Sequence, residues 1–116
     1  MNEYGLKKKA RGPARKNRRV PVMTAAEAIK LVKDRDVVAM CGCGGGINEA
    51  SELITALADR YRETRSPQDL TFYHSTGLGD RADRGMSPLA QPGLVKRDIG
   101  GHWGQSPRLC EMAERN

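Results

Sequence analysis

The sequence predicts an α/β domain with a parallel sheet, and three observations carry that prediction. Apolar runs of strand length alternate with segments of helical periodicity from Val20 onward. Each of the first two runs ends in a glycine-bearing loop, at residues 42–46 and 76–80. The first of these loops is followed by a long amphipathic segment. A helix-strand-helix-strand order is typical of a parallel sheet covered by helices.

The first 19 residues differ in composition from the rest. They contain eight Lys and Arg residues and one acidic residue, whereas residues 20–116 contain 12 basic and 13 acidic residues. A segment with so few apolar residues cannot offset its conformational entropy by burial, so we expect a disordered basic tail over residues 1–19. The tail can be a solvated extension, a contact to nucleic acid or another anionic surface, or a mitochondrial presequence, although it lacks the serines and the apolar face of a presequence.

The first helix is predicted to run from Thr24 to about Lys33. Thr24 and Glu27 have the spacing of a capping box, and apolar residues follow at helical intervals. The apolar run at 36–41 is predicted to be a buried parallel strand, because it is continuous rather than alternating. After the glycines, Asn48 is a candidate N-cap for the next helix. That helix has a predicted core-facing stripe made of Ala50, Leu53, Ile54, Leu57, Ala58 and Tyr61.

The second half of the chain predicts two more strands and a C-terminal helix. Residues 70–75 and 94–101 are the strands, and two prolines confine residues 86–93 to a turn or a very short helix. Ser106 is a predicted N-cap, and the proline that follows it suits the first turn of a helix.

The cysteines and the hydropathy exclude several classes of protein. Cys41, Cys43 and Cys110 are odd in number, and C-x-C is not the C-x-x-C spacing of zinc and redox sites. We therefore expect free thiols, buried or half-buried, and no metal. No apolar stretch approaches the roughly 18 residues of a membrane span. These observations predict a cytoplasmic protein that has no membrane contact.

The strongest candidate binding element is the glycine loop, residues 42–46. It does not match G-x-G-x-x-G, because Ile47 stands where the third glycine belongs, and no Gly-Lys-Ser/Thr closes it as a Walker A loop. Glycines before a helix can leave backbone N–H groups free for an anion, a phosphate or a developing oxyanion. Taken alone, the loop is explained equally well as a tight strand-to-helix connection without a ligand.

Several segments, taken in order, resemble the family I coenzyme A transferases of the acetate or propionate CoA-transferase type. They are residues 19–22, 36–47, 53–59, 76–85 and 101–107, and the resemblance covers about 97 of the 116 residues. The Gly-x-Gly-Gly loop of that family is matched by residues 42–45. The resemblance implies a partial parallel-sheet α/β sandwich over residues 20–116, a truncated N-terminal CoA-transferase domain. It implies substrate-binding roles for Gly42, Gly44, Gly45 and Gly46.

The resemblance also implies an activity, the transfer of CoA between an acyl-CoA and a short-chain acid such as acetate, propionate or a 3-oxo acid. In that family a glutamate forms a glutamyl-CoA thioester, so coenzyme A is a substrate and no other cofactor is implied. The glutamate lies in a Ser-Glu-Asn-Gly type of motif that these residues lack. We therefore assign no catalytic residue and expect the chain alone to be inactive. Glu49 and Glu52 are weak substitutes, because the helix dipole already favours carboxylates there.

The implied partners are the missing C-terminal half or a second subunit, with a homo-oligomer as the complete enzyme and no nucleic acid. His102 and Trp103 are interpreted as packing at a strand end. The charge run at 80–84 is interpreted as a solvated face, with a cleft wall or subunit contact as the other possibility. The alternative function is a small non-enzymatic α/β binding module with a basic nucleic-acid-contacting arm.

Overall fold

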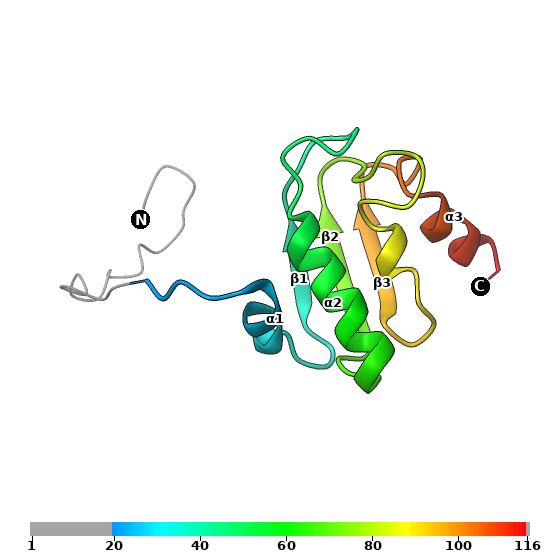
Figure 1. The fold of residues 1–116 in the computed structure, drawn as a ribbon. Coiled ribbons are helices and arrows are strands. Elements are labelled where there is room, and N and C mark those ends of the chain that lie inside the picture. The colour runs from blue at the N-terminus through cyan, green and yellow to red at the C-terminus, as the bar shows by residue number, and fades with distance from the viewer. Residues whose placement is uncertain (1–19, 116) are drawn as a thin grey trace, which may run out of the picture.

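The computed structural model describes residues 20–115 and contains a three-stranded parallel sheet with helices beside it (Figure 1). The strands are β1 (Val37–Met40), β2 (Leu70–His74) and β3 (Val95–Gly100), in the order β1-β2-β3. The α-helices are α1 (Ala25–Ala28), α2 (Ser51–Thr64) and α3 (Pro107–Glu114), and short 3-10 helices form η1 (Ile29–Leu31) and η2 (Ser87–Leu89). The predicted α/β class with a parallel sheet is confirmed. The tail predicted over residues 1–19 lies outside the described residues.

Thr24 begins α1 with the predicted capping box. Its hydroxyl accepts a hydrogen bond from Glu27 N–H at 3.3 Å, and the Glu27 carboxylate accepts one from Thr24 N–H at 2.8 Å. The backbone N–H of Thr24, and then its hydroxyl, lower the pKa of Glu27. The helical segment ends with η1, short of the predicted Lys33. Beyond η1, the Lys33 N–H donates to the Asp36 carboxylate at 2.8 Å instead of to a helical carbonyl, so the chain leaves the helix there.

The apolar face of α2 is narrower than the sequence predicts. Ile54, Leu57, Ala58 and Tyr61 are buried. Ala50 and Leu53 are exposed, so the prediction is wrong for these two residues. Because the helix begins only at Ser51, Ala50 precedes its regular periodicity, and no part of the described chain covers Leu53. Neither α2 nor any other helix within residues 20–115 combines the length and apolar character needed to cross a membrane.

Asn48 is not the N-cap of α2, so that prediction is also wrong. The N-cap is Ala50, which forms no capping hydrogen bond through its side chain. Asn48 instead has a φ of 54° and continues the loop that the glycines begin. Asparagine suits this left-handed conformation because its short polar side chain can hydrogen-bond locally. The same residue type therefore serves a turn here and not a cap.

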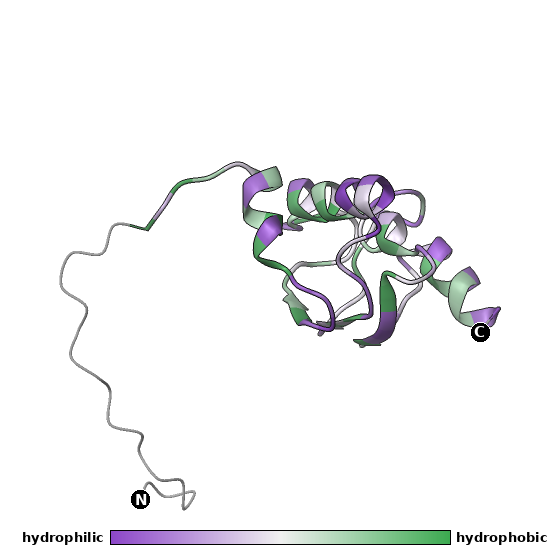
Figure 2. Ribbon diagram, turned by 90° about the horizontal axis from the view of Figure 1, so that it is seen from below, coloured by the Kyte–Doolittle hydropathy of each residue, from purple (hydrophilic) through white to green (hydrophobic). Residues whose placement is uncertain are grey.

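Within the described residues, the sheet is covered on one face only (Figure 2). The register places Val38 beside Phe72 on the covered face, and Ala39 beside Tyr73 on the other face. Burial alternates along β1, where Val37 is 71% exposed, so the prediction of a buried strand is wrong. A continuous apolar run suits a strand with two covering layers, and residues 20–115 supply one layer.

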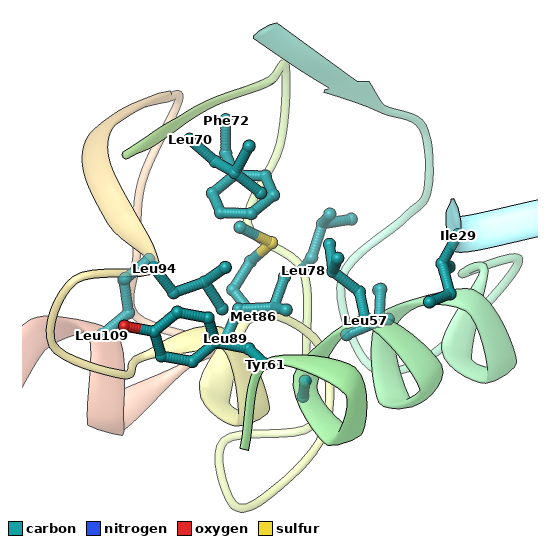
Figure 3. Packing of buried hydrophobic residues seen from close by; sticks show 12 residues of the cluster. Ile29, Leu57, Tyr61, Leu70, Phe72, Leu78, Met86, Leu89, Leu94 and Leu109 are labelled. Atoms are coloured by element: carbon teal, nitrogen blue, oxygen red, sulfur yellow. The ribbon is translucent and has the colours of Figure 1, made fainter. Parts of the chain in front are cut away.

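The core lies between α2 and the covered face of the sheet (Figure 3). Leu70 and Phe72 of β2 are fully buried there. Tyr61 of α2 crosses the core and donates its hydroxyl to the Pro92 carbonyl at 2.7 Å, which satisfies the one polar atom of its side chain. The segment between β2 and β3, which includes η2, closes the core with Leu78, Met86, Leu89 and Leu94. This aliphatic core holds the strand ends that carry the candidate site.

Replacing Glu27 with Gln is expected to remove an acid-sensitive contribution to the stability of α1. A carboxyl whose pKa is lowered on folding stabilises the folded state above its ordinary value of 4.5, and this effect is lost as the pH falls through the folded value. NMR protection factors of the Thr24 and Glu27 amides should therefore fall between roughly pH 6 and pH 3 in the wild-type chain, and much less in Glu27→Gln.

Thr24→Ala is the matched control for this experiment. It removes the hydroxyl half of the capping box and should cost about 1 kcal/mol of local stability near neutral pH. The cost should be smaller at acid pH, because the hydroxyl also helps to lower the pKa of Glu27, but the Thr24 N–H still binds the carboxylate and keeps most of the acid sensitivity. Equal loss of protection toward acid in Glu27→Gln and in the wild-type chain would contradict the role assigned to the carboxylate.

Candidate functional site

The candidate site lies at the carboxyl edge of the sheet, which we define as the edge where all three strands end. The strands are parallel, so the loops that follow them meet at this edge (Figure 1). They are the glycine loop with its extension, residues 41–50, the second loop, residues 75–86, and the third loop, residues 101–106. Ligands of open parallel sheets bind outside the carboxyl ends of the strands.

The glycine loop is a tight turn held at two points. Cys43 N–H donates to the Ile47 carbonyl at 3.0 Å, and Gly45 N–H donates to the Gly79 carbonyl of the second loop at 2.8 Å. Gly45 and Gly46 have φ values of 83° and 77°, a backbone conformation that residues other than glycine rarely adopt. The loop therefore owes its shape to glycine and is attached to its neighbour through the backbone.

The four glycines predicted to bind substrate divide into two pairs. A Cβ atom on Gly42 would lie 2.8 Å from the Leu78 side chain, and one on Gly44 would lie 3.2 Å from the Gln105 amide nitrogen. Gly45 and Gly46 have no atom within 4 Å of such a Cβ and face open space. The first pair permits close packing between loops, whereas the second pair leaves room for a ligand.

Three backbone N–H groups of the loop have no hydrogen-bond partner among residues 20–115, those of Gly42, Gly44 and Gly46. Those of Gly44 and Gly46 flank Gly45, which faces open space. Such donors suit an anion or a carbonyl oxygen that gains negative charge. The helix dipole contributes less than the sequence predicts, because α2 begins at Ser51 and residues 47–50 separate it from the glycines. The donors of this site are loop amides.

Glu49 connects the glycine loop to the second loop. Its Oε1 accepts from Gly79 N–H at 2.7 Å, and its Cγ lies 3.0 Å from the position that a Gly42 Cβ would occupy. Its Oε2 is buried and has no partner among the described residues. Glu52 is exposed in the first turn of α2. The contacts of Glu49 are those of a carboxylate that holds two loops together.

The third loop covers the second loop. The imidazole of His102 lies directly over Gly77, where the Nε2 atom would be 2.6 Å from a Cβ. Ser106 is the N-cap residue of α3 with Pro107 in the first turn, as predicted, but its side chain makes no capping hydrogen bond. Its hydroxyl instead donates to the Leu78 carbonyl and accepts from Met86 N–H at 2.9 Å, which fastens the second loop. Side chains of the third loop therefore pack against the backbone of the second loop.

A buried network that the sequence interpretation missed fixes the ends of β2 and β3. His74 Nε2 is 2.8 Å from Asp98 Oδ1, and His74 Nδ1 is 2.6 Å from the Thr76 carbonyl. Trp103 Nε1–H also donates to Asp98 Oδ1, at 2.7 Å. The His74 and Asp98 side chains are 1% and 7% exposed.

Both ring nitrogens of His74 lie within hydrogen-bond distance of an oxygen atom. Nδ1 faces the Thr76 carbonyl, and Nε2 faces the Asp98 carboxyl group, whose Oδ1 also accepts from Trp103. Gly100 is required beside the ring, because any Cβ there would overlap the imidazole. A histidine that ends one strand and an aspartate on the same face of the next strand are the only sequence signals of this pair.

The charge run at 80–84 is exposed, as predicted, but its backbone is ordered by its own aspartate. Asp80 Oδ1 accepts from the N–H groups of Arg84 at 3.1 Å and Ala82 at 3.0 Å. These bonds lower the pKa of Asp80, with that of Arg84 contributing most. Arg81 N–H donates to the Gln105 carbonyl at 2.9 Å and ties the run to the third loop. Its role as a cleft wall or subunit contact stays a prediction.

The cysteines lie partly where they were not expected. Cys41 and Cys43 are exposed at the glycine loop, so the prediction of buried thiols is wrong for them, whereas Cys110 is half-buried. Both residues follow the end of β1 at Met40 and lie in the exposed loop, so they are not buried by the sheet. Within residues 20–115, no three His, Cys, Asp or Glu side chains gather as a metal site.

A hollow of about 710 Å³ lies between α1, α2 and residues 83–88, away from the glycine loop. Three carboxylates and one guanidinium line it, so it is unsuited to an anion. They belong to Glu52, Asp59, Asp83 and Arg84. The carboxyl edge therefore remains the candidate site for an anionic or carbonyl-bearing ligand.

Gly79→Ala and Gly45→Ala are expected to differ sharply in stability. A Cβ on Gly79, at a φ of 128°, would overlap the Gln105 carbonyl and lie 3.0 Å from the Arg84 carbonyl, so the loops must separate. We expect a loss of about 3 kcal/mol or more. Gly45 has no neighbour in the way, and its left-handed conformation alone should cost about 1–2 kcal/mol. Urea unfolding followed by circular dichroism measures both, and equal losses would contradict the packing described.

Asp98→Ala is expected to cost about 3–5 kcal/mol, because it leaves the buried Nε2 of His74 and the Nε1–H of Trp103 without their partner. Trp103→Phe is the matched control, since it removes one donor to the same carboxyl group, keeps the contact between His74 and Asp98 and should cost about 1.5–3 kcal/mol. Thermal unfolding ranks the variants. A loss for Asp98→Ala no greater than that for Trp103→Phe would show that the pair contributes little.

Comparison with known proteins places the chain in a family. A protein-family profile described as Coenzyme A transferase matches residues 22–115. The chain is 58% identical over 104 residues to the acetate CoA-transferase YdiF of Escherichia coli strain K12, and 36% identical over 91 residues to the caffeate CoA-transferase of Acetobacterium woodii. These matches cover 90% and 78% of this chain, but 20% and 17% of the two relatives.

Solved structures agree with the sequence relatives. The apoenzyme of the acyl-CoA transferase YdiF from Escherichia coli O157:H7 matches with a TM-score of 0.83 at 57% identity, over 90% of this chain and 20% of that one. Its thioester complex with CoA matches with a TM-score of 0.82 at 57% identity, over 84% and 19%. The chain thus spans about a fifth of the length of the relatives it matches. The matched residues contain all three strands and the loops of the carboxyl edge, and the chain belongs to the coenzyme A transferase family.

Proposed function

We propose that this chain forms the glycine-loop side of the acyl site in an enzyme that moves CoA between an acyl-CoA and a short-chain acid such as acetate, propionate or a 3-oxo acid. One observation carries the proposal. The N–H groups of Gly44 and Gly46 have no partner among residues 20–115, beside two glycines that leave open space in front of them. Family membership makes an acyl-CoA the ligand of first choice for these donors.

The proposed reaction proceeds through an enzyme-bound CoA thioester. A glutamate carboxylate attacks the carbonyl carbon of the acyl-CoA and expels the CoA thiolate, which leaves a mixed anhydride on the glutamate. The thiolate then attacks the glutamyl carbonyl of the anhydride, so that the glutamyl-CoA thioester forms and the donor carboxylate is released. The acceptor carboxylate attacks this thioester, and the same two displacements in reverse yield the new acyl-CoA and the free glutamate. In each addition the carbonyl oxygen gains negative charge. Two backbone donors aimed at that oxygen stabilise it, and the loss of one such donor typically slows acyl transfer by about 10²–10³-fold.

The attacking glutamate is proposed to lie outside these 116 residues. Glu49 is the acidic residue closest in sequence to the glycine loop, and its Oε1 is already bonded to Gly79 N–H. Turning it toward a substrate would break the contact between the first two loops. Accordingly, we propose that the missing part of the enzyme, in the same polypeptide or a second subunit, brings the nucleophile, and that the complete enzyme is a homo-oligomer.

The alternative function, a non-enzymatic module with a basic arm, is not favoured by any feature of residues 20–115. The arm itself belongs to residues 1–19, outside the described part. The basic excess of the sequence is confined to the first 19 residues, since residues 20–116 hold 12 basic and 13 acidic side chains. The acyl-site proposal therefore stands as the principal one.

NMR titration of the isolated chain tests this function. Adding acetyl-CoA should shift the amide resonances of Gly44 and Gly46, because their N–H groups are the proposed donors. Gly93 is the matched control, since it also has a positive φ, of 86°, but precedes β3 at the opposite edge of the sheet. Acetyl-CoA:propionate exchange should be absent from the isolated chain. Exchange by these 116 residues alone, or equal shifts at Gly93, would overturn the proposal.

A further inference from the structure

The uncovered face of the sheet is formed by alternate residues of all three strands. In a parallel sheet, residues paired in register lie on the same face. One row across the sheet joins Ala39, Tyr73 and Ile99, and the adjacent row joins Val37, Thr71 and Arg97. We call these six residues the open sheet face.

The open sheet face is apolar and exposed. Val37, Tyr73 and Ile99 are 71%, 53% and 39% exposed, and Ala39 is exposed as well. Phe72 and His74, which precede and follow Tyr73 in β2 and lie on the covered face, are almost fully buried. The contrast arises because α1 and α2 lie on one side of the sheet, with no described element on the other (Figure 2).

Two physical arguments indicate that this face has a partner. Sheets made only of parallel strands occur almost always with both faces covered, because their strands are apolar on both sides. Adjacent exposed apolar side chains of this kind mark interaction surfaces in folded proteins. A single charged side chain, Arg97, lies within the apolar rows, so the partner surface must also satisfy a guanidinium.

The comparisons identify what is absent. The structures of YdiF match this chain with a TM-score of 0.83 over 90% of its length, yet the match is 20% of that protein. About four-fifths of a family member therefore has no counterpart here, which is ample chain for a second layer. Three strands with both outer edges unpaired within residues 20–115 also leave room for that remainder to extend the sheet.

We propose that the open sheet face is the docking surface for the CoA-transferase segment that this chain lacks, which covers it with the apolar side of a helical layer and places an acidic side chain against Arg97. The occupant is the remainder of a CoA-transferase, arriving in the same polypeptide or in a second one. This inference depends on family membership and on the sheet, and it does not depend on the reaction proposed above.

Fragment complementation tests the proposal. The 116-residue chain, with an affinity tag, is co-expressed with the part of Escherichia coli YdiF that the match does not cover, and the two are purified through the tag. The wild-type chain should retain the YdiF segment. Tyr73→Asp and Ala39→Lys should each weaken retention about tenfold or more, since a charge is buried at the centre of the contact. Arg97→Glu should weaken it similarly, by placing like charges together.

Leu53→Asp and Leu31→Asp are the matched controls. Both residues are exposed leucines, at 42% and 71%, on helices that lie on the opposite side of the sheet, so retention should change less than about twofold. Circular dichroism of each variant shows whether the isolated chain keeps its fold. Ala39→Lys remains informative if Tyr73→Asp unfolds, because a lysine at an exposed alanine needs no space in the core.

Three outcomes would overturn the inference. They are failure of the wild-type chain to retain the YdiF segment, equal losses in the controls and in Tyr73→Asp, and a stable dimer of the chain alone that Tyr73→Asp dissociates. The last outcome, read by analytical ultracentrifugation, would assign the face to a second copy. A complex that forms normally but transfers no CoA would contradict the proposed function and leave the docking surface intact.

Discussion

The absence of a side chain at Gly79 is the constraint on which the carboxyl edge depends. Its N–H donates to Glu49, its carbonyl accepts from Gly45, and its Cα lies against Gly85. The Gln105 carbonyl fills the remaining side, where any Cβ would have to be. Three loops from three strands therefore meet at one residue through backbone contacts. Because each contact uses a main-chain atom, the edge acts as one packed unit.

Local patterns predicted the elements well, and the error on the burial of β1 has a non-local cause. The capping box of Thr24 and the order of helices and strands follow from propensity and periodicity, which are local properties. So does the burial of Ile54, Leu57, Ala58 and Tyr61. The exposure of β1 does not, because a continuous apolar run describes a strand with two covered faces, and only one cover is present in residues 20–115. Burial depends on elements that a local pattern cannot supply.

In the candidate site, too, local patterns predicted some features and could not predict those that depend on other segments of the chain. Glycine content located the loop at residues 42–46, but it could not separate Gly42 and Gly44, which pack, from Gly45 and Gly46, which face open space. The pairing of His74 with Asp98 needs the register of two strands, which a single sequence does not contain. The N-cap prediction for Asn48 was wrong because asparagine is common both at helix N-caps and in left-handed turns. Which of the two it forms depends on the path of the loop that follows.

The two anchor points of the glycine loop have a consequence for the thermodynamics of binding. Cys43 and Gly45 each use their N–H groups to fix the turn, so the N–H groups of Gly44 and Gly46, which alternate with them, are already oriented when the chain has folded. A ligand at this edge meets donors whose conformational entropy was lost during folding rather than on association. Preorganisation of this kind lowers the entropic penalty of each encounter, and it makes the rigidity of the turn as important to affinity as the number of its donors.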